Sequence, residues 1–163
     1  MPQRASLQRL LREFQAGELS RDQFFSGLTE WVAEAIGCTR ASVWFFSPDR
    51  EYLVCQDLFT SHNGQHTQGD RLLRVSFPDY FWSLEESRAI VAPEARTDPN
   101  TACFNDAYFI PLDIHSLLDA GITRDGHVVG VVCCEHTGQA RAWEPADVLS
   151  ARMAAMLVEA AGL

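Results

Sequence analysis

Residues 116–135 read SLLDAGITRDGHVVGVVCCE, and this stretch decides the fold. It contains two apolar segments, Ser116–Ile122 and Val128–Glu135, on either side of Arg124-Asp125-Gly126, a turn in which Gly can supply a positive φ. The second segment is continuously apolar, which is typical of a strand buried on both faces. We therefore predict an antiparallel sheet centred on Val128–Glu135, with Ser116–Ile122 and Ala41–Phe46 as its neighbours.

Outward from this hairpin, the chain alternates between helical and strand patterns. Ser20 and Gln23 form a capping box at the start of a helix that Gly37 ends. The predicted elements are helices over Ser6–Gln15, from Ser20 to Ile36, from Pro78 to Leu84, from Asp98 to Asp106 and over Pro145–Ala161, strands over Tyr52–Leu58, Arg71–Val75 and Ala89–Ala92, and a loop over Thr60–Gly69. This order indicates the α+β class. We expect five or six antiparallel strands, with the terminal helices on one face and short helices and loops forming a pocket on the other.

Composition limits the partners. The 163 residues suit one domain over residues 19–163, preceded by an amphipathic helix within residues 1–18. The net charge of −9 repels phosphate backbones and anionic lipid, so we expect no nucleic acid and no membrane partner. Five cysteines, mostly within apolar runs, are typical of reduced thiols in the cytoplasm, and we expect no disulfide. His62 and His66 lie in the predicted loop, so we expect no metal.

Five segments resemble the core of a GAF domain. They are residues 88–92 (RAIVA), 98–101 (DPNT), 108–120 (YFIPLDIHSLLDA), 130–136 (GVVCCEH) and 141–143 (RAW). The resemblance covers roughly Leu19–Ala161 and is to the bacterial subgroup that precedes histidine kinase, diguanylate cyclase or PAS modules. It implies a sensory module that binds an unknown small ligand and signals in a two-component or cyclic-dinucleotide pathway.

The same resemblance bears on cofactors. The Asn-Lys-Phe-Asp-Glu motif of cyclic-nucleotide-binding members is missing, which disfavours a cyclic nucleotide. Phytochrome-like members attach a bilin through a Cys beside a His, and no such pair occurs, which disfavours a bilin. Cys103 lies in the region of a variant photoreceptor cysteine, but Thr101 stands where that variant has Asp. We therefore expect no cofactor.

Two alternatives to a sensor stay open. Some relatives reduce free methionine sulfoxide with cysteines near the pocket, and Cys103, near a helix start, has the position that can lower a thiol pKa. The matching Gly-flanked Cys after the third strand is missing, and no Gly-x-Ser-x-Gly elbow surrounds Ser116. We expect no enzymatic activity and no catalytic residue. The other alternative is a dimerisation scaffold whose pocket is filled by side chains.

Pocket residues are expected around an aromatic cluster, Phe77, Tyr80, Phe81 and Trp82. Four rings in six residues exceed what one helical face can bury, so some of them face a ligand or a partner. Carboxylates and polar groups on other elements complete the set. The candidate ligand-binding residues are Tyr80, Trp82, Asp98, Cys103, Tyr108, Ser116, Asp119 and Glu135.

The first helix carries an apolar stripe of Leu7, Leu10, Leu11 and Phe14. A helix of this length is marginal alone, so the stripe must be buried on the domain or on a second copy. The closing helix has no Lys or Arg in its last turn, as expected of a helix that continues into an output domain. We predict a homodimer through the terminal helices, with the leucine stripe at its interface and a kinase or cyclase domain downstream.

Overall fold

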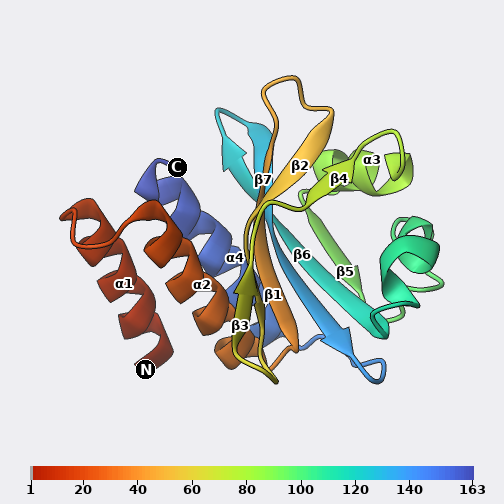
Figure 1. Cartoon of the computed structure of the whole chain (residues 1–163), viewed down its shortest axis with the longest axis horizontal. Coiled ribbons are helices and arrows are strands. Elements are labelled where there is room, and N and C mark those ends of the chain that lie inside the picture. Colours follow the sequence, from red (N-terminus) through yellow and green to blue (C-terminus); the bar gives the residue numbers. More distant parts are fainter. Residues whose placement is uncertain (1) are drawn as a thin grey trace.

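A twisted antiparallel sheet separates two helical layers in the computed structural model, which describes residues 2–163 and their side chains from Leu7 onward (Figure 1). The elements are α1 (Pro2–Gln15), α2 (Arg21–Ile36), β1 (Arg40–Phe46), β2 (Tyr52–Thr60), β3 (Gln65–Thr67), β4 (Arg71–Leu73), α3 (Pro78–Ser87), β5 (Ala89–Ala92), a 3₁₀ turn (Ala102–Phe104), a π turn (Asn105–Phe109), β6 (Ile114–Arg124), β7 (His127–Thr137) and α4 (Pro145–Ala161). This is the predicted α+β class.

The sheet is centred on β7, as predicted. Its strand order is β3-β2-β1-β7-β6-β5, and β4 also pairs with β2. Strand β7 is antiparallel to both β1 and β6, which confirms the predicted neighbours. The sheet has seven strands because Gln65–Thr67, inside the predicted loop Thr60–Gly69, pairs with the end of β2. These three residues are polar, so no apolar pattern marks them as a strand.

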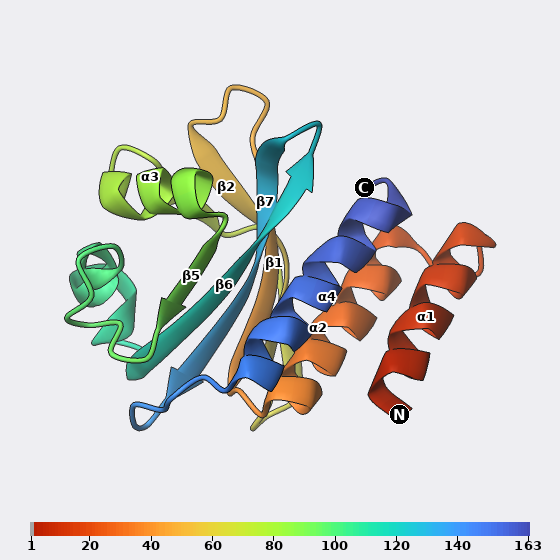
Figure 2. The same cartoon turned by 180° about the vertical axis from the view of Figure 1, so that it is seen from behind.

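The helices are divided between the two faces of the sheet (Figures 1 and 2). Helices α2 and α4 cover one face, with α1 packed on their outer side, while α3 and the 3₁₀ and π turns lie over the other face. Two separate clusters of buried residues fill the spaces, one on each side of the sheet. Side chains of β1 and β7 alternate between them, because successive residues of a strand point to opposite faces. Ala41, Val43, Val132 and Cys134 face the terminal helices, and Ser42, Trp44, Cys133 and Glu135 face α3 and the turns.

The start and end of α2 follow the predicted caps. Ser20 Oγ accepts a hydrogen bond from the Gln23 N–H at 3.1 Å, and Gln23 Oε1 accepts one from the Ser20 N–H at 2.9 Å. Gly37 ends the helix with φ 73°, and its N–H bonds the carbonyl of Ala33. The capping box and the left-handed glycine fix where α2 begins and ends.

Strand β2 contains a bulge at Gln56. The pairs Val43↔Asp57 and Trp44↔Cys55 leave Gln56 without a partner on β1. The inserted residue reverses which face the following side chains point to. Leu53 and Cys55 face α3 before the bulge; after it, Asp57 turns toward α2, where its Oδ2 accepts a hydrogen bond from Thr29 Oγ1 at 2.5 Å.

Helix α1 packs on the chain's own terminal helices. Leu7 is buried, and Leu10, Leu11 and Phe14 pack against the same core. The Phe14 and Phe24 rings are 4.8 Å apart, and Leu10 lies over Gly27 of α2. The stripe assigned to a dimer interface therefore contacts α2 and α4 of the same chain, which satisfies its need for burial without a second copy.

The segment after β5 differs from the single short helix expected over Asp98–Asp106. Asp98 Oδ1 accepts a hydrogen bond from the Asn100 N–H at 2.9 Å, and the chain then forms the 3₁₀ turn followed by the π turn. Asn105 holds this path by donating from Nδ2 to the carbonyl of Arg96 at 2.8 Å. Short 3₁₀ and π segments often mark functional sites, and this one forms a wall of the pocket described next.

Candidate functional site

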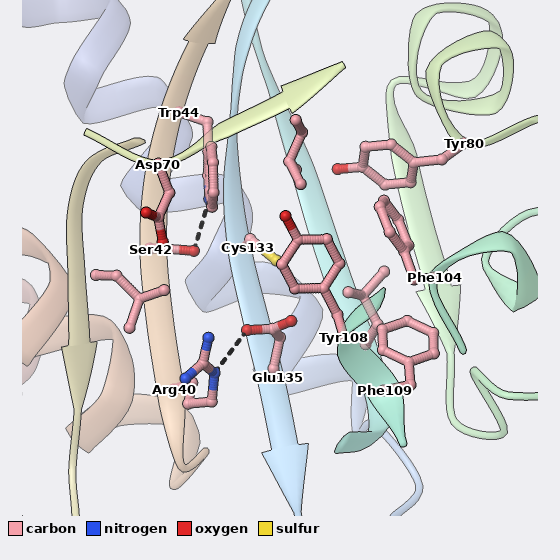
Figure 3. A pocket seen from close by; sticks show the side chains of 13 residues that line it. Arg40, Ser42, Trp44, Asp70, Tyr80, Phe104, Tyr108, Phe109, Cys133 and Glu135 are labelled. Carbon is pink, nitrogen blue, oxygen red and sulfur yellow. Dashed lines mark hydrogen bonds and ion pairs between the residues drawn. The ribbon is translucent and has the colours of Figure 1, made fainter. Parts of the chain in front are cut away.

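A pocket opens between the sheet and the 3₁₀ and π turns (Figure 3). Its walls are mostly aromatic and aliphatic, with a few polar groups, as in small-molecule sites. It encloses about 50 Å³, and about 500 Å³ lies between its walls when the open mouth is included. The lining residues are Arg40, Ser42, Trp44, Leu58, Asp70, Leu72, Tyr80, Phe104, Tyr108, Phe109, Leu117, Cys133 and Glu135.

An ion pair lies at one end of the pocket. Arg40 and Glu135 are paired residues of β1 and β7, and Arg40 Nε donates to Glu135 Oε1 at 3.0 Å. Their side chains are only 19% and 13% exposed, so water screens the pair weakly. A ligand that reaches this end meets a guanidinium for its acceptors and a carboxylate for its donors.

Aromatic rings form the wall opposite β1 and β7. The ring centroid of Phe104 lies 4.5 Å from Phe77, 4.7 Å from Tyr80 and 5.6 Å from Phe109. Tyr108 faces the pocket from the π turn, with its hydroxyl toward the sheet (Figure 3). Such tilted and edge-to-face contacts stabilise the layer and present flat apolar surfaces to a planar molecule.

A buried acid on β6 faces the Tyr80 hydroxyl. The Tyr80 hydroxyl donates a hydrogen bond to Asp119 Oδ2, and Asp119 is fully buried. Burial raises the pKa of Asp119 to about 7, because the charged form loses its hydration. Burial and the nearby Asp119 charge also raise the pKa values of Tyr80 and of the Cys133 thiol well above their usual range.

Four of the eight candidates meet at this pocket. Tyr80, Tyr108 and Glu135 line it, and Asp119 on β6 accepts the hydrogen bond of the Tyr80 hydroxyl. Trp82 lies outside it, since it is 65% exposed and does not line the pocket.

The other three candidates also lie outside the lining. Asp98 caps the turn at Asn100. Ser116 Oγ donates to the carbonyl of Pro93 at 2.6 Å and accepts from the Arg141 N–H at 2.9 Å, which ties two loops to the sheet. Cys103 is half-buried beside α3, and burial raises its thiol pKa, opposite to the lowering that its position near a helix start suggested.

Most of the residues that line the pocket were not predicted from the sequence, although the position of one of them, Arg40, follows from the predicted strand pairing. The predicted antiparallel pairing of Ala41–Phe46 with Val128–Glu135 places Arg40 near Glu135, so this ion pair could have been predicted from the sequence. The residues not predicted are Arg40, Ser42, Trp44, Leu58, Asp70, Leu72, Phe104, Phe109, Leu117 and Cys133.

His66 has a different environment from the loop expected for it. It lies in β3, where Nδ1 is 2.9 Å from Asp57 Oδ2 and Nε2 is 2.9 Å from Glu30 Oε1. Burial lowers its pKa, but the two carboxylates together raise it by more, so the net direction is up. Across residues 2–163, His, Cys, Asp and Glu side chains form no group of three or more that could hold a metal ion. Within the same range, no helix has the length and apolar character needed to span a bilayer.

The GAF domain family model matches residues 20–161 of this chain. No curated protein sequence matches it significantly. Two similar solved structures are the phycoerythrobilin-bound and phycocyanobilin-bound GAF domains from a cyanobacterial phytochrome, both 16% identical. Their TM-scores are 0.79 and 0.76, over 98% of this chain and 93% and 92% of theirs. The free methionine-R-sulfoxide reductase from Neisseria meningitidis in complex with its substrate is 14% identical, with a TM-score of 0.72 over 98% of this chain and 87% of that one.

These structures correct the expectation about cofactors. The absence of a Cys-His pair led us to expect no bilin, and this expectation is wrong. The similar structures include GAF domains with phycoerythrobilin and phycocyanobilin bound, so the fold of this chain is one that holds bilins in other proteins. A missing attachment motif removes one covalent link and leaves the shape of the fold unchanged.

Proposed function

This chain belongs to the GAF domain family, and from that premise we propose that it is a cytoplasmic sensory module whose pocket binds a planar, conjugated small ligand. The observation that carries the proposal is the pocket itself, in which an aromatic wall faces a partly buried Arg40–Glu135 pair. Flat rings stack on aromatic side chains, while the ion pair binds a polar edge. A bilin has this combination of a conjugated body and polar edges.

The size of the pocket adds a condition. An enclosed space of about 50 Å³ takes a fragment or a few water molecules, whereas a larger ligand requires the turns over Ala102–Phe109 to move outward. A ligand shifts such an equilibrium only by binding the open form more tightly than the closed one. We propose that this movement is the primary response to the ligand.

Strands β1 and β7 connect the pocket to the terminal helices, so a movement at the pocket can be transmitted through them. Each carries pocket residues on one face and residues packed against α2 and α4 on the other, one peptide unit apart. We propose that the module acts as a homodimer on a kinase or cyclase partner. Because the stripe of α1 is used within the chain, we place the contact on the outer side of α4, where Leu149 and Met156 are exposed.

The first test is ligand capture. Native mass spectrometry of the purified chain is expected to show a co-purified small molecule, and phycocyanobilin added to the purified chain is expected to bind with a change in the bilin's visible absorption. Tyr108→Ala removes one ring from the pocket wall and is expected to weaken binding about tenfold. Trp82→Ala, an exposed aromatic outside the pocket, serves as the control and is expected to bind as the unmutated chain does. Equal weakening by both variants, or no bound molecule and no phycocyanobilin binding, contradicts the proposal.

We propose that the chain is not a reductase, and its thiols provide the second test. Burial raises the pKa of Cys55 to about 12 and that of Cys103 in the same direction, so neither is primed as a thiolate. At pH 7.5, a thiol reagent such as DTNB is expected to modify Cys103 more slowly than free cysteine and the four buried thiols only after unfolding. Selective, fast modification of Cys103 together with turnover of free methionine-R-sulfoxide supports the reductase instead.

A further inference from the structure

Tyr80 places a polar atom on an otherwise apolar part of the pocket wall. It lines the pocket from α3, and Figure 3 shows its hydroxyl directed into the space between the sheet and the aromatic wall. That hydroxyl donates its single proton to Asp119 Oδ2 on β6. The tyrosine oxygen therefore offers lone pairs, and no proton, to anything that enters the pocket.

The partner of Tyr80 is poorly satisfied. Asp119 is fully buried, and its second oxygen, Oδ1, has no hydrogen-bond partner among residues 2–163. Cys133, its cross-strand neighbour on β7, has a thiol, which is a weak donor. A buried carboxylate with so few donors draws strongly on the tyrosine proton, and this polarises the Tyr80 oxygen into a good acceptor.

We propose that Tyr80 and Asp119 together set which hydrogen-bonding groups the pocket accepts in its ligand. With Asp119 ionised, Tyr80 accepts a hydrogen bond from a ring N–H of a planar ligand. With Asp119 neutral, the acid proton is donated to the Tyr80 oxygen, and the Tyr80 hydroxyl turns to donate to an acceptor on the ligand. This inference rests on the proposed function, because it specifies the edge of the same ligand.

The titration properties of the surrounding groups support a switch near neutral pH. Burial raises the pKa of Asp119 to about 7, whereas Tyr80 from α3 and Cys133 from β7 have pKa values well above their usual range and stay neutral. Glu135 of β7 is the other nearby charge and is bonded to Arg40 of β1. Across from Asp119 on β5 lies Ile90, which is apolar. A ligand that donates an N–H prefers ionised Asp119, so its affinity rises as the pH increases through about 7.

Two fragments of equal shape test this. Indole has a ring N–H where benzofuran has a ring oxygen, so their affinities differ through the hydrogen bond. Titrations followed by ¹H–¹⁵N NMR at pH 8.5 are expected to show indole binding about tenfold more tightly, as one added hydrogen bond allows. At pH 5.5 the preference is expected to fall below about threefold, because Tyr80 then donates.

Two variants separate this mechanism from a structural role. Tyr80→Phe keeps the ring and removes the oxygen, and is expected to show no preference between the fragments at either pH. Asp119→Asn keeps an acceptor for the Tyr80 hydroxyl and does not titrate, so its preference for indole is expected to be the same at both pH values. Thermal unfolding and the NMR spectrum of each variant establish that it is folded before its affinities are compared.

The outcomes distinguish this inference from the proposed function. If indole and benzofuran bind the unmutated chain equally well, the proposed ligand pocket is supported and only the inference about Tyr80 and Asp119 is overturned. An unchanged preference in Tyr80→Phe, or a pH dependence that persists in Asp119→Asn, overturns it as well. If neither fragment binds in the pocket, the proposed function fails and this inference fails with it.

Discussion

Replacing Gly130 by alanine is expected to lower the free energy of unfolding by about 3 kcal/mol. Gly130 lies in β7 opposite Phe45 of β1, and a Cβ there would meet the Trp44 carbonyl oxygen at 2.3 Å. That oxygen belongs to the backbone of the neighbouring strand, so relief requires the two central strands to separate locally. Denaturant unfolding followed by circular dichroism measures the loss.

Gly27→Ala is the matched control. Its Cβ would meet Leu10 Cδ1 at 2.8 Å, but this atom ends a flexible side chain on α1 that can rotate away. Alanine also favours the helical conformation by about 1 kcal/mol over glycine, so the net change is expected to stay within about 1 kcal/mol of zero. If the two variants lose similar stability, the backbone contact at Gly130 is not the cause.

Phe104→Ala is expected to lower the free energy of unfolding by about 3–5 kcal/mol, the usual range for removing a buried phenylalanine. Phe104 is buried at the centre of the aromatic layer, in ring contact with Phe77, Tyr80, Tyr108 and Phe109. The substitution also enlarges the pocket, so the same variant tests both the packing of the wall and the binding of small molecules in the enlarged space. Thermal and denaturant unfolding measure the effect.

A second measurement identifies the source of this loss. A dry space between aromatic side chains binds small apolar molecules, so benzene is expected to raise the melting temperature of Phe104→Ala more than that of the unmutated chain. Trp82→Ala, on the exposed side of α3, is expected to change stability by less than about 0.5 kcal/mol. A loss in Phe104→Ala below about 1 kcal/mol shows that the pocket wall is not packed as the ring contacts indicate.

Strands with strong apolar patterns were predictable, and weak ones were not. Val128–Glu135 carries seven apolar residues in succession, and the structure places it at the centre of the sheet. The three residues of β3 carry no such pattern, because an edge strand can be formed by backbone pairing alone. The same reason explains why five or six strands were expected where seven occur.

The pocket was predictable where side-chain type and position agreed. Tyr80 and Tyr108 belong to aromatic segments over the sheet, and Glu135 ends the central strand. Trp82 is also aromatic, but it lies two residues from Tyr80 on α3, which places it on another side of that helix. Within the cluster Phe77, Tyr80, Phe81 and Trp82, the side of α3 on which a ring lies, and not its being aromatic, decides whether it reaches the pocket.

The remaining site residues depend on long-range geometry. Asp70 and Phe104 reach the pocket from a loop and a 3₁₀ turn whose paths are set by distant hydrogen bonds, such as those of Asn105 with Arg96. The hydrogen bonding of the Asp119 carboxyl likewise depends on Tyr80, which is 39 residues away in sequence. Local patterns do not contain this information.

The bulge at Gln56 has a consequence for changes in chain length. On the N-terminal side of Gln56, Leu53 and Cys55 face α3, and on its C-terminal side Asp57 and Phe59 face the terminal helices while Leu58 lines the pocket. Deleting one residue here would restore regular pairing with β1 and leave one flank of β2 with its faces exchanged. Either Leu58 would leave the pocket or Asp57 would lose Thr29. A single-residue deletion in β2 is therefore not equivalent to one in a loop, and an alignment of this chain with its relatives must place its gaps outside Leu53–Phe59.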